Sequence, residues 1–183
     1  MVYRFKLVSD EVSNFSREIE IDSENTFLQL RNVILESVGF TKDELDSFFL
    51  CNDDWEREEE VTLEDMGSSA SDCDQWLMES TPLDELIEDE GQKLSFVFDY
   101  LTERSFFLEL KETIPSRSLV EPICTMKRGK APAQFVDMNE FEKSIDAGAN
   151  SSALEDLVEI DGIDSREFND EELEEGFDII DDM

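Results

Sequence analysis

The start of the chain alternates between apolar and polar positions in a way that predicts two strands. In residues 2–8, Tyr3, Phe5 and Leu7 fall on one parity and the basic residues fall on the other. This period of two is typical of a half-buried strand. Residues 15–21 repeat the pattern, with Arg17 as a charged residue on the apolar parity. The connection between the two segments is short and polar, so we expect an antiparallel hairpin.

From residue 27 the spacing of the apolar residues becomes that of a helix, three or four positions apart. The stripe consists of Phe27, Leu30, Ile34 and Val38. Polar residues at 22–25 offer oxygens for the N-cap, and Gly39 is a natural residue to follow the last turn. Thr41 and Glu44 have the spacing of a second capping box, which predicts a short helical turn after the helix.

Two later segments alternate strictly and predict a second hairpin. In residues 94–100 and 106–110 the apolar side chains lie on one parity, and a polar turn separates the two segments. Pro115 should end this hairpin, because proline cannot donate a hydrogen bond to a ladder. Short runs at 47–51 and 60–63 each have the length of one more strand.

The remaining segments complete the predicted fold. Thr81-Pro82 predicts the start of a short helix, and residues 116–134 are expected to form an extended connection. Together the elements predict an α+β fold, a mixed or mainly antiparallel sheet of about five to six strands with one long helix packed across it. Its ββαβ start is β-grasp-like. The residues predicted to form the core are Phe5, Ile19, Leu30, Ile34, Phe96, Phe98 and Leu108.

The charge of the chain is strongly negative and is distributed unevenly. The 183 residues include 49 Asp and Glu but only 15 Lys and Arg, which gives a formal net charge of −34. Residues 131–183 contain 18 acidic residues and only two basic ones, Lys143 and Arg166. This shift in composition predicts a folded domain over residues 1–135 and an acidic, partly helical or mobile tail over residues 136–183.

Charge and composition exclude several classes of function. The acidic excess argues against direct binding of nucleic acid, which needs many cations facing phosphates, and against docking on anionic membranes. No apolar run approaches the ~18 residues of a membrane span, and the N-terminus lacks the apolar core of a signal peptide, so we expect a cytoplasmic protein. The chain has no histidine, which removes Ser-His-Asp and Cys-His catalysis. We expect no cofactor.

Several charged groups are candidates for a site. The only basic cluster is Lys127, Arg128 and Lys130, which could bind phosphate or an acidic peptide. An acidic run over residues 53–60 surrounds Trp55 and could hold a divalent cation or a basic partner, but the favoured interpretation is a solvated loop between strands. In the tail, apolar residues stand among the carboxylates and could dock on a partner. Those selected as interaction candidates are Phe168, Phe177 and Ile180.

Five segments, in order along residues 2–135, resemble one bacterial family. They read VYRFKLV, REIEIDSENTFLQLRNVILESVGF, LSFVFDY, LKETIP and EPICTMKRGKAPAQF. The chain thereby resembles the plasmid pRiA4b ORF-3-like family, whose members are also described as transposon passenger proteins. The resemblance implies a compact α+β domain and no established activity.

The chain departs from the family pattern at two places. Many members have an H-x-H-x-F segment after the helix, where this chain reads DELDSFF. Many also have a Gly-Asp-x-Trp turn in the hairpin, where Asp99-Tyr100 here runs into LTERSFF. A site built on those residues is therefore not expected in this chain.

These observations favour a non-enzymatic protein-interaction module. The acidic charge favours a protein partner with a basic surface, because opposite charge steers association. Two alternatives remain open at this point. One is an acidic mimic of nucleic acid that occupies a basic DNA-binding protein, and the other is a carboxylate-metal enzyme of unknown type.

Overall fold

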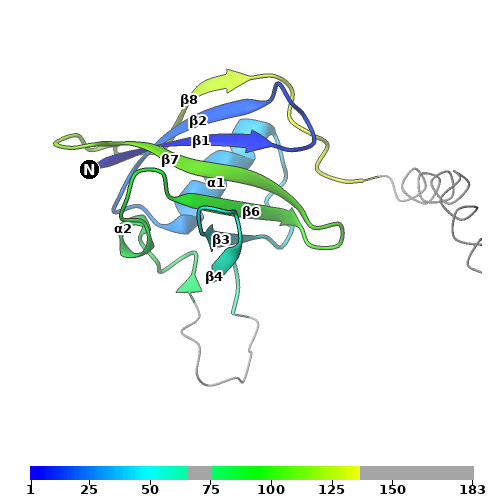
Figure 1. Cartoon of the computed structure of the whole chain (residues 1–183), viewed down its shortest axis with the longest axis horizontal. Coiled ribbons are helices and arrows are strands. Elements are labelled where there is room, and N and C mark those ends of the chain that lie inside the picture. The colour runs from blue at the N-terminus through cyan, green and yellow to red at the C-terminus, as the bar shows by residue number, and fades with distance from the viewer. Residues whose placement is uncertain (66–75, 137–183) are drawn as a thin grey trace, which may run out of the picture. The chain divides into compact units, whose positions relative to one another are not determined.

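The computed structural model describes residues 1–65 and 76–136, and one large sheet dominates that part of the chain (Figure 1). Its eight strands follow one another in the order β5-β4-β3-β6-β7-β1-β2-β8. All neighbours are antiparallel except β4 and β5, which are parallel. The strands are β1 (Val2–Ser9), β2 (Ser16–Asp22), β3 (Ser47–Cys51), β4 (Arg57–Thr62), β5 (Trp76–Leu77), β6 (Lys93–Asp99), β7 (Arg104–Ile114) and β8 (Ile123–Arg128).

The predicted fold class is wrong. The described part is mainly β, with eight strands in one sheet and two short helices, α1 (Phe27–Val38) and α2 (Leu83–Leu86). It is not a sheet of five or six strands with one long helix. The sequence prediction missed β5 and β8. The strand β8 lies within the segment predicted to be an extended connection. It pairs with β2, whose residues lie more than a hundred positions earlier in the sequence.

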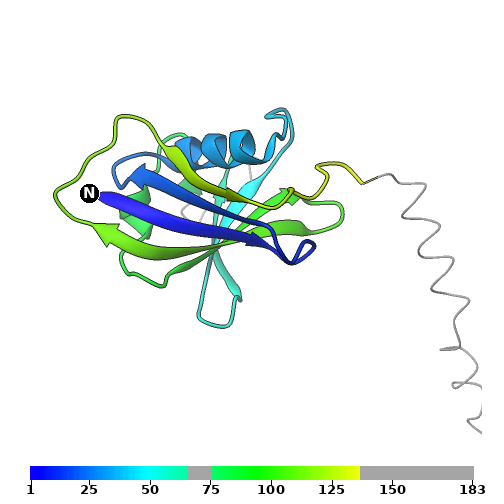
Figure 2. The same ribbon diagram turned by 90° about the horizontal axis from the view of Figure 1, so that it is seen from above.

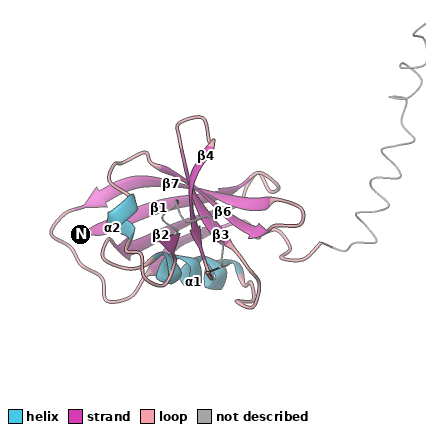
Figure 3. Cartoon of the chain, turned by 90° about the horizontal axis from the view of Figure 1, so that it is seen from below, coloured by secondary structure: helices cyan, strands magenta, loops and turns pink. Residues whose placement is uncertain are grey.

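The helix α1 covers one face of the sheet, and the β3–β4 hairpin projects from the opposite face (Figures 2 and 3). Apolar side chains fill the layer between α1 and the sheet, and all seven residues predicted to form the core are at most 4% exposed. Aromatic rings pack closely within this layer, with 4.7 Å between the centroids of Phe48 and Phe96 and 4.6 Å between those of Phe98 and Phe106.

The ends of α1 are partly as predicted. Gly39 caps the C-terminus with a φ of 76°, as expected. The N-cap is Thr26, which forms a capping box with Gln29, and not one of the polar residues at 22–25. The predicted turn at Thr41 and Glu44 is absent. Instead, the Thr41 amide donates a hydrogen bond of 2.8 Å to the side-chain oxygen of Gln134.

A buried ion pair ties α1 to the segment that follows it. The Arg31 Nε atom lies 2.6 Å from Asp46 Oδ1, and both side chains are at most 4% exposed. Arg31 also donates through Nη2 to the backbone carbonyls of Lys42 and Glu44. Burial raises the pKa of the Asp46 carboxyl, and Arg31 opposes this shift. The pair therefore closes the loop between α1 and β3.

Among the helices in the described residues, none has the length and apolar character that a membrane crossing requires.

Candidate functional site

The predicted basic cluster lies at the end of β8 and in the loop after it. Lys127 and Arg128 are the last residues of β8, Lys130 follows Gly129, and all three cations are exposed. The structure adds Lys6, an exposed residue of β1, because Lys6 and Arg128 line the same cleft. We call Lys127–Lys130 the basic loop, and Lys6 with the three cations of that loop the cation cluster.

No member of the cation cluster has an ion-pair partner within the described residues. Most other described cations do pair with carboxylates, and these are Arg4, Arg31, Lys42, Arg104, Lys111 and Arg117. Arg57 and Lys93 instead lie over aromatic rings. In a chain with 49 acidic residues, a group of cations without ion-pair partners is a candidate surface for binding an anion, although Glu18 and Glu109 lie opposite Lys6 in the sheet register.

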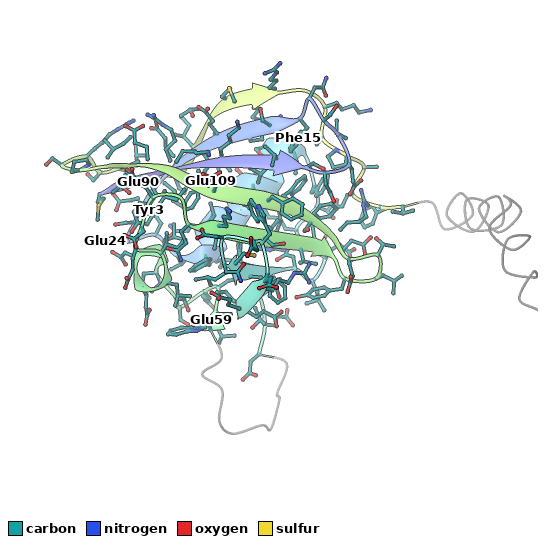
Figure 4. All side chains as sticks on the ribbon, viewed as in Figure 1. Tyr3, Phe15, Glu24, Glu59, Glu90 and Glu109 are labelled. Atoms are coloured by element: carbon teal, nitrogen blue, oxygen red, sulfur yellow. The ribbon has the colours of Figure 1, made fainter. Side chains whose placement is uncertain are left out.

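Arg17 holds the basic loop in place. Its guanidinium is buried and lies 4.4 Å from the centroid of the Phe15 ring. The Nη1 atom donates hydrogen bonds to the carbonyls of Arg128 at 2.8 Å and Gly129 at 3.3 Å. Burial lowers the pKa of Arg17. The residue that interrupts the apolar parity of β2 is thus the anchor of the loop, and Figure 4 places its neighbour Phe15 at this end of the sheet.

Gly129 lets the basic loop pass close to the β1–β2 turn. Its φ is +67°, and a Cβ atom built on it would lie 2.5 Å from the backbone oxygen of Asn14. A side chain at this position would therefore meet both backbone strain and a steric clash.

We expect Gly129→Ala to lower the free energy of unfolding by about 2 kcal/mol or more, because left-handed strain alone costs ~1–2 kcal/mol. Gly39→Ala is the matched control, since Gly39 has a φ of +76° and no heavy atom within 4 Å of a built Cβ. Urea titration measures the free energy of unfolding of both variants. The loss in Gly39→Ala gives the cost of backbone strain, and the additional loss in Gly129→Ala gives the cost of the clash with Asn14. Equal losses in the two variants would show that the approach to Asn14 is not tight.

A polar cleft lies on one side of the basic loop, with a volume of about 220 Å³. Lys6 and Arg128 line it together with Ser13, Asn14 and Ser16. In the register of the sheet, Ser16 stands between Val8 of β1 and Arg128 of β8. Ser16 has a short side chain beside Arg128, and Lys6, two residues before Val8, lines the same cleft. This is a geometry in which an anion can be bound.

An apolar groove of about 480 Å³ lies on the other side of the loop. Val12, Val38, Phe40 and Pro132 line it, and Lys130 contributes a charge. Its outer wall is the segment Lys130–Gln134, which Arg104 holds through hydrogen bonds to the carbonyls of residues 133 and 134. The Gln134 side chain also forms hydrogen bonds with the backbone of Thr41. Residues 133 and 134 of the wall are therefore bonded both to β7, through Arg104, and to the segment after α1.

The acidic candidates do not converge in the described residues. The carboxylates of the run at 53–60 are exposed, and Figure 4 shows Glu59 on the hairpin of β4, at the sheet edge away from Phe15. No group of three or more Cys, Asp or Glu is placed to hold a metal ion within the part of the chain that the structure describes. Burial opposes the shift at Asp99, but hydrogen bonds from Thr102 and Leu101 lower the pKa of this carboxyl, as in an ordinary capped turn.

Neither the apolar residues of the tail nor the cysteines contribute to a site in the part of the chain that the structure describes. The tail residues Phe168, Phe177 and Ile180 lie outside the described residues, and the basic partner expected from the acidic charge stays a prediction. The thiols of Cys51 and Cys124 are free, and burial raises the pKa of both, which keeps them protonated and weakly nucleophilic.

Sequence reasoning missed Lys6, Ser16 and the apolar groove. Lys6 looked like the solvent side of an ordinary strand, and only the pairing of β1, β2 and β8 brings it near Arg128. The available signal was parity, because Lys6, Ser16 and Glu18 all lie on the polar positions of their strands.

Comparison with known proteins agrees with the sequence resemblance. A search of curated proteins gave no match. Among solved structures, the crystal structure of the protein of unknown function MM3350 from Methanosarcina mazei is similar, with a TM-score of 0.59 and 20% sequence identity. The match covers 86% of this chain and 87% of that one, and at this identity it shows the fold alone.

The family comparison covers more of the sequence than the resemblance did. The family described as plasmid pRiA4b ORF-3-like protein matches residues 2–175, past the domain boundary predicted after residue 135. That boundary therefore stays a prediction. Because the match spans well over half of the sequence, the chain belongs to the plasmid pRiA4b ORF-3-like family.

Proposed function

We propose that the chain is a protein-interaction module that binds an acidic segment of a partner protein at the basic loop and the apolar groove beside it. The observation that carries the proposal is the cation cluster, whose members have no ion-pair partners in the described residues although the chain carries a net charge of −34. An acidic segment would supply the missing partners. This proposal concerns the described domain and is separate from the expectation about the tail.

Charge alone would not hold such a segment. Exposed ion pairs contribute about 0–1 kcal/mol each, and salt weakens them further. The apolar groove supplies the second part of the interaction, since burying one Leu or Phe side chain contributes about 1.5–3 kcal/mol. Lys130 lines this groove, so a carboxylate next to an apolar residue of the partner can reach a cation while the apolar side chain is buried.

Repulsion from the rest of the chain limits the range of the attraction but does not abolish it. At physiological salt, charges are screened over about 8 Å. A bound segment therefore interacts mainly with the cations it touches. This argument favours a short contact over the basic loop and not long-range capture of acidic proteins.

The proposal predicts that a labelled peptide of Glu residues around a central Leu binds the full chain in a fluorescence-anisotropy titration. Lys127→Glu with Lys130→Glu should weaken binding by about tenfold or more, because two attractions become repulsions. Replacing the central Leu with Gly should also weaken it. No binding by the wild-type chain would overturn the proposal.

The matched control makes the same change in charge elsewhere. Lys111 and Arg57 are exposed cations on β7 and β4 and do not line the cleft or the groove. Lys111→Glu with Arg57→Glu should change the affinity by about twofold or less. An equal loss in both double variants would mean that total charge alone governs binding, and the basic loop would not be the docking site.

A further inference from the structure

The polar cleft has the features of a site for a dianion. We propose that the cleft between Lys6 and Arg128 is a phosphate subsite that takes a phosphorylated serine or threonine side chain of the bound segment. The inference rests on the proposed function, because it names a chemical feature of the same partner. It uses different residues, Lys6 and Arg128, from those that test the docking of the acidic segment.

The number and origin of the cations favour phosphate over carboxylate. A phosphorylated side chain carries about −1.5 to −2 charge at pH 7 and three strong acceptor oxygens, whereas a Glu carries a single charge. Lys6 and Arg128 reach the cleft from two different strands, with β2 between them. Arginine can also bind two phosphate oxygens at once through its planar guanidinium.

The neutral groups of the cleft are suited to the same ligand. Ser13 and Ser16 contribute hydroxyl groups and Asn14 contributes an amide beside the two cations, while Val8 and Phe15 form the apolar part of the lining. No acidic residue lines the cleft. Two carboxylates lie opposite Lys6 in the sheet register, Glu18 on β2 and Glu109 on β7, and neither forms an ion pair with Lys6 in the described residues.

The size of the cleft and the rigidity of its backbone also suit a bound phosphate group. The cleft has a volume of about 220 Å³ and is open to solvent on one side, so a phosphate monoester with its four oxygens can enter it. The backbone of Arg128 is fixed by the hydrogen bond from the buried Arg17. A preorganised backbone lowers the entropy that binding must otherwise remove, and this favours a specific site over an incidental cluster of charge.

The test compares three labelled peptides of one sequence in which one position is phosphoserine, Glu or Ser. With the full wild-type chain, the phosphoserine peptide should bind about tenfold more tightly than the Glu peptide. Lys6→Gln with Arg128→Gln should reduce this ratio to about one, whereas Lys127→Gln with Lys130→Gln should weaken both peptides and preserve the ratio. A wild-type ratio near one, with the Glu peptide still bound, would overturn the phosphate subsite and leave the proposed function standing.

A second measurement separates failure of the subsite from failure of the docking surface. The ³¹P resonance of free O-phosphoserine should shift or broaden on addition of the wild-type chain but not of the Lys6→Gln, Arg128→Gln variant. If no peptide binds but this effect is seen, the subsite stands and the proposed function fails. If inorganic phosphate binds as tightly as the phosphoserine peptide, the cleft takes a free anion and the assignment to a phosphorylated side chain is overturned. Absence of any phosphate-dependent effect would overturn it as well.

Discussion

Replacing Ile34 with aspartate should unfold the sheet domain. Ile34 lies on the buried stripe of α1 and is 0% exposed. The buried cations are already engaged, Arg31 with Asp46 and Arg17 with backbone carbonyls, so a carboxylate at position 34 would be unpaired in the apolar layer. An unpaired charge in a core costs several kcal/mol. Because a whole domain is stable by only about 5–15 kcal/mol, this single change removes much of that stability. Circular dichroism during heating would show the loss as a large drop in, or absence of, the thermal midpoint.

Two controls distinguish the effect of charge burial from a general sensitivity of α1. Asn32→Asp adds the same charge to the same helix at a half-buried position and should have a much smaller effect. Ile34→Val removes one methylene and should cost only about 0.5–1.5 kcal/mol. A wild-type thermal midpoint for Ile34→Asp would contradict the packing of α1 on the sheet.

Local patterns predicted those elements whose burial is periodic. Tyr3, Phe5 and Leu7 alternate because β1 buries one face, and the helical stripe through Ile34 follows one side of α1. The hairpin of β6 and β7 was predicted from the alternation of apolar and polar residues in its sequence, although β6 is buried on both faces and the register shifts between Val97 and Asp99. In each case the signal is set by the residues of the element itself, which is why the sequence is sufficient.

The strands that were missed have no such local signal. In β8 exposed and half-buried positions alternate but no residue is buried, and Pro122 stands directly before the strand. The segment becomes a strand because β2 offers a partner, with Ile19 opposite Cys124. The helix cap was misplaced for a related reason. Several polar residues could serve as N-cap, and only the capping box with Gln29 selects Thr26.

The candidate site was predictable only in part. The basic loop is visible in the sequence as the one group of cations in an acidic chain. Its cleft was not visible, because Lys6 joins Arg128 through two strand pairings. Arg17 looked like a defect in β2, yet its position is explained by the backbone carbonyls that it binds. A charged residue at an apolar position of a strand can therefore indicate a buried side chain that binds backbone carbonyls.

Removing the carboxylate of the buried ion pair should have the second-largest effect on stability. In Asp46→Ala, Arg31 keeps its charge but loses the oxygens that lie 2.6 and 2.7 Å from its Nε atom. Leaving one buried charge without its partner typically costs about 3–5 kcal/mol. We expect a loss of this size in the free energy of unfolding, measured by urea titration at neutral pH.

The stabilities of three further variants would show whether the unpaired charge of Arg31 causes the loss of stability in Asp46→Ala. Asp46→Asn keeps an acceptor for Arg31 and should lose less than Asp46→Ala. Arg31→Met with Asp46→Leu replaces the pair by apolar groups of similar volume and should also lose less than the single alanine variant, because no buried charge remains. Lys42→Ala breaks the exposed pair with Glu36 and should cost about 1 kcal/mol or less. If the double variant were the least stable of the four, the ion pair itself, with its links to the loop carbonyls, would be the stabilising element, and desolvation of an unpaired Arg31 would not explain the result.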